Sequence, residues 1–487
     1  MYQDRFTVRS FSVRSISVFL VILIIVMSFG GYLYYRDEDK ESDKGPEVDL
    51  GFETENIQVQ GSPQNTNEVS IAVNPTNPMN VVAGANDYST PRNDAWCGYY
   101  WSMNGGESWT TGLLPGFQGD LSVDGLTSPL LIYDGTGDPV LAFDSLGNLY
   151  YAGIAFSRTI VGRSAIFVAK STDGGMTWPS TLIRIVAYGD GITTFHDKEW
   201  MIVDPTNDYI YVAWASFHAL SQATILFSRS VNGGNTWSMW DIASDLQGGQ
   251  LDNQGTYLDV DTEGIIHLIW IDFGASAIQY IYSVDHGLSF SPPVSIVDVD
   301  PIPYQLEHNT YRTPTLPQLA IDRSDGRYKD SIYVTWNDGS NGDADIFLIY
   351  SRDSGVSWSE PIRVNQDGFQ NGKDQFFPGL SVTPEGKVVM HFYDRRDDEE
   401  NTLMNVYYAI SGDGGRSYKD HILSDTSFDG EGGGGSMLGQ ATGGEAFIGD
   451  YHTSVSVEDR TYFIWCDTRN GDPNDRNSDV YAAYVDI

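Results

Sequence analysis

Cysteine is scarce in this chain of 487 residues, which contains only Cys97 and Cys466. Two cysteines cannot build the disulfide framework that stabilises small secreted domains. Two interpretations of the pair stay open: one disulfide between the first and last repeats described below, or two buried free thiols. Histidine is also rare, with eight residues and no spacing such as His-x-x-x-His, so we expect no zinc site.

Basic residues are few, because 28 Lys and Arg stand against 66 Asp and Glu, which gives a formal net charge of −38. Nucleic-acid binding needs clustered basic side chains, so we expect no nucleic-acid partner. The same charge repels anionic ligands at long range, although salt screens this repulsion beyond about 10 Å. The acidity indicates either a solvated acidic surface or loops that bind cations.

Long hydrophobic runs are absent except for one near the N-terminus. Residues 15–35 carry no charge, and a helix of this length spans about 30 Å of hydrocarbon. Three arginines precede the run and acidic residues follow it, so the positive-inside rule leaves residues 1–14 in the cytoplasm. The sequence predicts a transmembrane anchor over 15–35, an acidic linker over 36–48 and a body at the cell surface. The alternative is a cleaved signal peptide and a secreted protein.

Glycine and aromatic residues are plentiful, with 51 glycines and 13% aromatics, as is typical of β-rich proteins with tight turns. One pattern, Ser-x-Asp/Asn-x-Gly-x-Ser/Thr-aromatic, occurs six times. Its Asp or Asn accepts hydrogen bonds from turn amides, its Gly adopts a positive φ and its aromatic residue packs beneath. The pattern therefore predicts a structural hairpin turn rather than a catalytic set. Its Asp or Asn residues are Asn104, Asp173, Asn232, Asp285, Asp353 and Asp413.

An apolar strand, a turn and a second strand precede each copy, and this unit recurs seven times at a spacing of about sixty residues. Units of this length suit four-stranded propeller blades. The seventh unit lacks its outer strand, which residues 53–60 are predicted to supply, so that no edge is left exposed. The sequence therefore predicts an all-β, seven-bladed β-propeller over residues 49–487, with six blades as the alternative.

The six copies resemble the Asp boxes of the sialidase superfamily, also called bacterial neuraminidase repeat proteins, over residues 65–487. The resemblance implies that the protein binds, and as an exo-α-sialidase type of glycoside hydrolase would cleave, glycans or another extracellular polymer at its loop rim. It implies no required cofactor. The alternative is a non-enzymatic cell-envelope scaffold that binds a protein partner, because fold does not determine function.

Up-and-down connectivity puts the ends of the second strands and the linkers between units on one rim, opposite the Asp boxes. The second strands end at Asn86, Ala155, Ser216, Asp272, Asp338, Asp394 and Asp467. The linkers add Asp197, Lys198, Glu199, Asp252, Gln254, Arg312, Asp374, Gln375, Asp450 and Tyr451. Each strand-end aspartate is interpreted either as a cap of its own loop or as part of a ligand-binding rim.

Sialidases generally hold the substrate carboxylate with three arginines and use an Asp acid/base and a Tyr nucleophile activated by a Glu. The arginines that the resemblance offers for this role are Arg395, Arg396, Arg469, Arg312 and Arg92. The other catalytic candidates are Tyr451 or Tyr393 as nucleophile, Glu199 as its partner, and Asp394. The Phe/Tyr-Arg-Ile-Pro motif of sialidases is absent near the start of the propeller, and its nearest match, residues 311–314, lies in the fifth unit.

Two acidic loops, residues 337–345 and 467–475, are candidates for binding Ca²⁺. They space hard oxygen ligands closely and contain glycines for the turns, although neither matches an EF-hand loop. The candidate ligands are Asp338, Asp343, Asp345, Asp467, Asp472 and Asp475.

Overall fold

The computed structural model describes residues 55–61, 65–91, 94–158, 162–191, 193–218, 222–238, 241–242, 252–432, 434–435, 446–471 and 477–487. The predicted cytoplasmic segment, membrane anchor and linker lie outside these ranges. Within them, no helix combines the length and the apolar character that a membrane crossing needs.

Seven antiparallel sheets of four strands make up the described part of the propeller, and each sheet is one blade. The inner strands are β2 (Thr66–Val73), β6 (Gly135–Phe143), β10 (Thr194–Val203), β14 (Asn253–Val260), β18 (Gln318–Ile321), β22 (Gln375–Val382) and β28 (Ser454–Val457). The second strands are β3 (Val81–Asp87), β7 (Leu149–Phe156), β11 (Ile210–His218), β15 (Ile266–Asp272), β19 (Ile332–Asp338), β23 (Val388–Asp394) and β29 (Arg460–Asp467). We number the blades 1 to 7 in this order.

The third strands are β4 (Trp96–Ser102), β8 (Ser164–Ser171), β12 (Gln222–Ser230), β16 (Ala277–Ser283), β20 (Asp345–Ser351), β24 (Asn405–Ser411) and β30 (Asp479–Asp486). The outer strands of blades 1 to 6 are β5 (Thr110–Leu113), β9 (Ile183–Gly189), β13 (Asp241–Ile242), β17 (Val294–Asp298), β21 (Ile362–Arg363) and β25 (Lys419–Ile422). The linkers between blades carry short elements: the helix α2 (Val123–Thr127), the 3-10 turns η1 (Pro129–Ile132), η2 (Ser180–Leu182) and η3 (Gly430–Gly432), and the strand pair β26 (Gly434–Gly435) and β27 (Ala446–Phe447).

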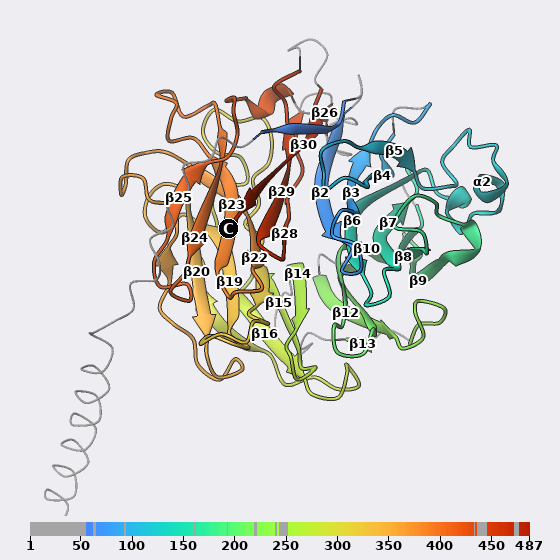
Figure 1. The fold of residues 1–487 in the computed structure, drawn as a ribbon, viewed down its shortest axis with the longest axis horizontal. Helices are drawn as coiled ribbons and strands as arrows, with labels where there is room; N and C mark the ends of the chain where they lie inside the picture. Colours follow the sequence, from blue (N-terminus) through green and yellow to red (C-terminus); the bar gives the residue numbers. More distant parts are fainter. Residues whose placement is uncertain are drawn as a thin grey trace, which may run out of the picture. The chain divides into compact units, whose positions relative to one another are not determined.

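The blades close into a ring, because each inner strand contacts the next one and β28 contacts β2 (Figure 1). Blade 7 takes its outer strand from the other end of the chain: β1 (Ile57–Gln60) pairs antiparallel with β30, with Ile57 opposite Ala482. This pairing confirms the predicted ring closure and the prediction of seven blades, and the six-bladed alternative is wrong.

The hydrophobic core is divided among the interfaces between neighbouring blades. One cluster joins blades 1 and 2 through residues such as Trp96 and Phe167, and another joins blades 7 and 1 through Tyr462 and Val81. Each second strand offers one face to each neighbour, so its residues are apolar almost throughout. A fully buried aromatic side chain stabilises the fold by on the order of a few kcal/mol, so the ring is held mainly by these interfaces.

The Asp boxes are the turns between third and outer strands, and they use the predicted hydrogen bonds. In blade 5, the Ser351 hydroxyl and the Ser357 amide both donate to Asp353 Oδ1 at 2.8 Å. Gly355 has φ +84°, and a Cβ there would lie 2.4 Å from the Tyr280 hydroxyl of blade 4. The box thus closes a hairpin and seats it against the preceding blade, which supports its structural interpretation.

The two cysteines are buried free thiols. Cys97 Sγ donates to the Gly137 carbonyl at 3.6 Å, and Cys466 Sγ donates to the Thr66 carbonyl at 3.3 Å. Each thiol therefore contacts the backbone of the next blade, and the disulfide interpretation is wrong.

Candidate functional site

Five inner strands carry a β-bulge at the equivalent position, close to the rim formed by the linkers between blades. The bulged residues with positive φ are Glu68 (53°), Asp138 (57°), Lys198 (51°), Gly255 (62°) and Phe377 (53°). A bulge redirects a side chain, and a non-glycine residue with positive φ is strained. Such strain clusters at functional sites. The three ionisable residues of blades 1, 2 and 3 therefore mark the bulges of the inner strands, which surround the central channel of the ring, as the candidate site.

Lys198 is the hub of a buried chain of ion pairs. Its Nζ lies 2.7 Å from Glu68 Oε1, 2.9 Å from Asp450 Oδ2 and 4.0 Å from Asp138 Oδ2. Arg312 holds Asp450 from the other side, with Nε and Nη2 each 2.6 Å from one carboxylate oxygen. The Arg312 side chain is 28% exposed, whereas that of Lys198 is 9% exposed, so the chain of ion pairs runs from the rim into the interior.

We call the following set the channel cluster: Glu68, Asp138, Asp197, Lys198, Glu199, Arg312, Asp450 and Tyr451. Five of its members are carboxylic acids and two are permanent cations, so not every charge can be neutralised by a partner. The burial of an unpaired carboxylate favours its protonated form.

Burial raises the pKa of Glu199 and of Glu68 well above the usual value, and it raises the pKa of Asp197 to about 6. Asp138 strengthens the effect on Glu68, because the two carboxyl groups repel each other and share a hydrogen bond. Burial would also raise the pKa of Asp450, but Arg312 and Lys198 outweigh it and hold that pKa below the usual value. The site thus contains carboxyl groups whose pKa values are shifted in opposite directions.

The Glu199 carboxyl group is buried, and among the described residues neither of its oxygens has a hydrogen-bond partner in another residue. Buried polar atoms are almost always satisfied by protein, water or ligand. Glu199 therefore has its hydrogen-bonding capacity free for a ligand or an ordered water.

A cavity lies beside Glu199 and is lined by the inner strands or linkers of blades 3 to 7. Trp200 and Tyr257 stack in its wall with ring centroids 3.9 Å apart, and Lys198 Nζ lies 4.6 Å from the centroid of Tyr451. The volume open to water centres is about 30 Å³, enough for a few water molecules. A sugar ring is larger than this enclosed volume.

The structure brings together six residues that the sequence analysis placed on the linkers: Asp197, Lys198, Glu199, Arg312, Asp450 and Tyr451. Tyr451 and Glu199 line the same cavity, yet the Tyr451 hydroxyl donates to the Pro139 carbonyl at 3.3 Å rather than to Glu199. Burial also raises the pKa of Tyr451 well above its usual value. The phenol is therefore held protonated in this arrangement.

The other described candidate arginines are bound by residues outside the channel cluster. Arg396 Nη2 lies 2.6 Å from both Asp394 and Asp420, and Arg469 pairs with Asp467 at 2.7 Å and with Asp425. Arg395 is buried and donates to Tyr311, Asn309 and the Asn401 carbonyl. Among the described residues no ion pair joins these arginines to the channel cluster, and Arg92 lies outside the described ranges. Tyr393 does not line the cavity, and its hydroxyl donates to the Cys466 carbonyl at 2.7 Å.

The aspartates at the ends of the second strands form local hydrogen bonds, which supports their interpretation as loop caps. Asp338 and Asp467 each accept from the indole of a tryptophan two residues earlier, at 3.0 and 2.8 Å. Asp394 accepts from the Arg396 amide at 2.8 Å, and Asp272 accepts from the Ala275 amide at 3.1 Å. These carboxylates stiffen the loops of the rim.

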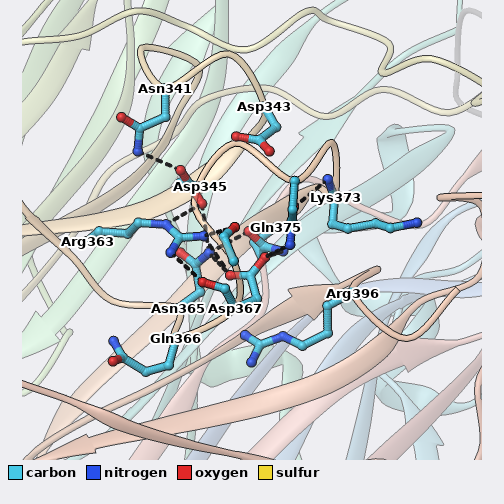
Figure 2. Close-up of polar contacts among 12 residues, drawn as sticks. Asn341, Asp343, Asp345, Arg363, Asn365, Gln366, Asp367, Lys373, Gln375 and Arg396 are labelled. Carbon is cyan, nitrogen blue, oxygen red and sulfur yellow. Dashed lines mark hydrogen bonds and ion pairs between the residues drawn. The ribbon is translucent and has the colours of Figure 1, made fainter. Parts of the chain in front are cut away.

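A second polar network joins blades 5 and 6 (Figure 2). Asp345 accepts from Arg363 Nε at 2.6 Å and from Asn365 at 2.7 Å, and Asn365 donates onward to Gln375 at 2.6 Å. Gln375 in turn donates to Asp394 at 3.2 Å, and Asp374 accepts from Asn401 at 2.6 Å. The donors around these carboxylates are amides and guanidinium groups, so the network fastens two blades together.

The predicted Ca²⁺ ligands that the structure describes, Asp338, Asp343, Asp345 and Asp467, do not form a metal cage. Among the described residues, no group of three or more His, Cys, Asp or Glu side chains is arranged to hold a metal ion. Asp343 accepts from the Gly372 amide at 2.8 Å, and Asp345 is paired with Arg363. Asp472 and Asp475 lie outside the described ranges.

Four residues of the site were missed by the sequence analysis: Glu68, Asp138, Trp200 and Tyr257. A signal for two of them is present in the sequence. Glu68 and Asp138, like Lys198, stand immediately before or within the apolar run of an inner strand. Charged residues at that place in three consecutive units predict a charged level inside the channel, once the units are aligned on their inner strands.

Comparison with known proteins supports the repeat assignment. Residues 196–425 match a family model described as BNR repeat-containing family member. A comparison with curated protein sequences finds no match. Two similar solved structures are the Hadza microbial sialidase Hz136 (14% identity, 83% of this chain and 73% of that chain, TM-score 0.44) and the Penicillium chrysogenum α-L-arabinanase complexed with arabinobiose (13% identity, 77% and 100%, TM-score 0.45).

The NanB sialidase from Streptococcus pneumoniae is similar at 11% identity over 88% of this chain and 70% of that chain, with a TM-score of 0.42. Similarity at this level carries no information on activity. The Asp boxes, the seven four-stranded blades and the family match identify the chain as a sialidase-like BNR-repeat propeller.

Proposed function

We propose that the protein is a glycan-binding propeller that hydrolyses a glycosidic bond at the channel cluster. One observation carries this proposal: two carboxyl groups line the same cavity with pKa values displaced in opposite directions. Burial raises the pKa of Glu199, whereas Arg312 and Lys198 outweigh burial and lower the pKa of Asp450. Pairs of this kind assign an acid and an anion in glycoside hydrolysis.

Glu199 is the general acid in this proposal. It gives its proton to the glycosidic oxygen as the C–O bond breaks, and water supplies the hydroxyl group to the sugar and returns a proton to Glu199. Asp450 stays ionised and stabilises the positive charge that develops on the sugar. The Trp200–Tyr257 stack supplies a flat apolar surface for a sugar face.

The proposal extends to location. The uncharged residues 15–35, with arginines before them and acids after them, support a membrane anchor that holds the propeller outside the cell. Added protease should then digest the propeller on intact cells, whereas digestion only after lysis would contradict this location.

A scaffold function is the second candidate, favoured by the small volume of the cavity and by the mutual pairing of Lys198, Glu68 and Asp450. In that case the channel cluster has a structural role, and the ion pairs of Lys198 with Glu68 and Asp450 join blade 3 to blades 1 and 7. The two functions differ in what substitution of Glu199 does, because its carboxyl oxygens take no part in the pairing.

The test is release of fluorophore from a panel of 4-methylumbelliferyl glycosides by the wild type and by Glu199→Gln. Loss of a general acid lowers the rate by about 10²–10⁴-fold, and the isosteric amide should leave the melting temperature nearly unchanged. Glu360→Gln, at an exposed position, is the control and should retain full activity. Cleavage of no glycoside, or equal activity of Glu199→Gln and wild type, would contradict the hydrolase proposal.

A further inference from the structure

Both cations of the channel cluster are already engaged by carboxylates of the chain itself. Arg312 uses two of its nitrogens on Asp450, and Lys198 bridges Glu68 and Asp450. The remaining carboxyl-bearing members, Asp138, Asp197 and Glu199, carry no positive charge. The site therefore offers an incoming carboxylate no unoccupied positive charge.

Binding of a substrate carboxylate would require an exchange of partners. If Arg312 turned to the substrate, the Asp450 carboxylate, which is 4% exposed, would keep only Lys198. If Lys198 turned instead, Glu68 would lose its cation while 3% exposed. Removing one partner of a buried ion pair is strongly unfavourable because it leaves an uncompensated buried charge.

The carboxyl oxygens of the site that lack a hydrogen-bond partner favour a neutral ligand instead of a carboxylate. The two Glu199 oxygens have no partner in another described residue. A sugar hydroxyl both donates and accepts a hydrogen bond, so it suits a carboxyl group in either protonation state. A carboxylate ligand accepts only, and the ionised Asp450 carboxylate in the cavity wall would repel it.

We propose that the channel cluster selects a neutral sugar and rejects a sugar that presents a carboxylate at this point. The inference rests on the proposed glycan binding and names its substrate class. It departs from the arginine-trio recognition that the sequence resemblance implied, because Arg312 is the only candidate arginine among the described residues that reaches the site.

The experiment uses ligand pairs that differ only in one charge: tri-galacturonate against its methyl ester, and 3′-sialyllactose against its methyl ester. Isothermal titration of the full chain should give at least about 30-fold tighter binding of the better ester than of its acid. Equal binding of acid and ester, or tighter binding of the acid, overturns the inference.

The net charge of −38 repels every anion at long range, so each titration is repeated at 1 M NaCl, where the screening length is about 3 Å. Discrimination within the buried site persists there, whereas discrimination due to the surface disappears and overturns the inference. Binding of an ester without hydrolysis of any glycoside overturns the hydrolase proposal alone. Failure of all four ligands to bind overturns both.

The Asp450→Asn variant tests whether binding of the acid can be gained, because this substitution frees Arg312 from its ion pair. The preference for the ester should fall at least tenfold in this variant. Asp420→Asn is the matched control, because it frees Arg396 from a similar pair outside the cavity, and it should leave the preference unchanged. An unchanged preference in folded Asp450→Asn overturns the inference, and the wild-type ligand pairs decide the question if that variant does not fold.

Discussion

At the scale of single residues, the unusual feature is a lysine with positive φ that is enclosed by carboxylates. Lys198 has φ 51° and contacts Glu68 and Asp450 from two other blades. A buried ion pair contributes little net stability compared with apolar packing, but breaking one is costly. An arrangement that combines this cost with backbone strain is typical of a functional site.

Replacing Lys198 with Met should destabilise the protein by about 3–5 kcal/mol, because it leaves two buried carboxylates without their common cation. Denaturant unfolding measures the change. Lys329→Met is the control: Lys329 pairs with fully exposed Asp325, so its loss should change stability by less than about 0.5 kcal/mol. Equal midpoints for the two variants would show that the Lys198 pairs are not needed in the folded state.

The stacked pair His391 and His452, with ring centroids 4.0 Å apart, should make the protein sensitive to acid. Burial lowers the pKa of His452 to about 3 and that of His391 well below the usual value. Between about pH 3 and pH 6.5 the unfolded state binds protons that the native histidines do not, so stability rises with pH and falls on acidification. Asp197, with its pKa raised by burial to about 6, opposes this trend, because native Asp197 binds the extra proton between about pH 4 and 6.

Melting temperatures from pH 4 to pH 7 for His452→Gln test this sensitivity. The variant should lose less stability than the wild type on acidification, whatever its stability at pH 7. His308→Gln, at an exposed position, should reproduce the wild-type slope. A slope of the same size in His452→Gln would contradict the assignment.

At the scale of structural elements, the Asp box is the most regular device in the molecule. All six copies place the Ser hydroxyl against the Asp or Asn side chain at 2.7–3.1 Å. The turn lies at the end of the blade opposite the channel cluster, because it joins the third strand to the outer strand. Its loss should therefore affect stability and leave ligand binding intact.

Asp353→Ala tests this separation of roles. It removes the acceptor of the Ser351 hydroxyl, the Ser357 hydroxyl and the Ser357 amide, and should cost about 1–3 kcal/mol in denaturant unfolding. Activity and ligand affinity should match the wild type at temperatures where the variant is folded. Impaired ligand affinity in the folded variant would link the Asp-box rim to the site.

The repeats and Asp boxes were predictable from the sequence, because each is a local pattern whose chemistry determines a strand or a turn. The site was predictable only in part. Residues such as Lys198 and Asp450, which were expected on the linkers, were placed on the correct rim by connectivity alone, although Lys198 lies within β10. The bulge that directs Glu68 into the channel is not encoded by any local motif, since it depends on how β2 packs against its neighbours.

The arginines show why a position on the rim does not determine whether a side chain reaches the candidate site. Arg396 and Arg469 follow second strands, as the alignment required, and each lies over a tyrosine ring, Tyr407 or Tyr481. Arg396 pairs with Asp420 on the outer strand of its own blade, whereas Arg469 pairs with Asp425, which follows the outer strand of blade 6. Those partners are distant in sequence and become neighbours only in the folded sheet. Sequence spacing therefore predicts at which end of a blade a residue lies, but it does not predict toward which neighbour its side chain points.

At the scale of the whole molecule, closure of the ring depends on a four-residue strand. The β1–β30 pairing is reinforced by Gln58, whose side chain donates to Asp479 at 2.9 Å, and by the Thr66 hydroxyl, which donates to the Ser478 carbonyl at 2.8 Å. Without β1, the third strand of blade 7 becomes an exposed edge, and exposed edges pair with other chains.

A chain beginning at residue 61 should therefore melt at a lower temperature than one beginning at residue 51, and it should form dimers or larger species. Differential scanning calorimetry and size-exclusion chromatography measure these two effects. Identical melting and elution of the two chains would mean that β1 contributes nothing to closure.

The pairing of β1 with β30 also has a consequence for biosynthesis. A ribosome makes β1 before the other strands of the propeller and β30 after them, so β1 has no partner until translation is almost finished. Blades 1 to 6 contain all their strands earlier and can fold in sequence as they emerge. The ring is therefore expected to close only after synthesis. A nascent chain truncated before Asp479 would lack β30, so both of its end strands would stay unpaired and prone to aggregation.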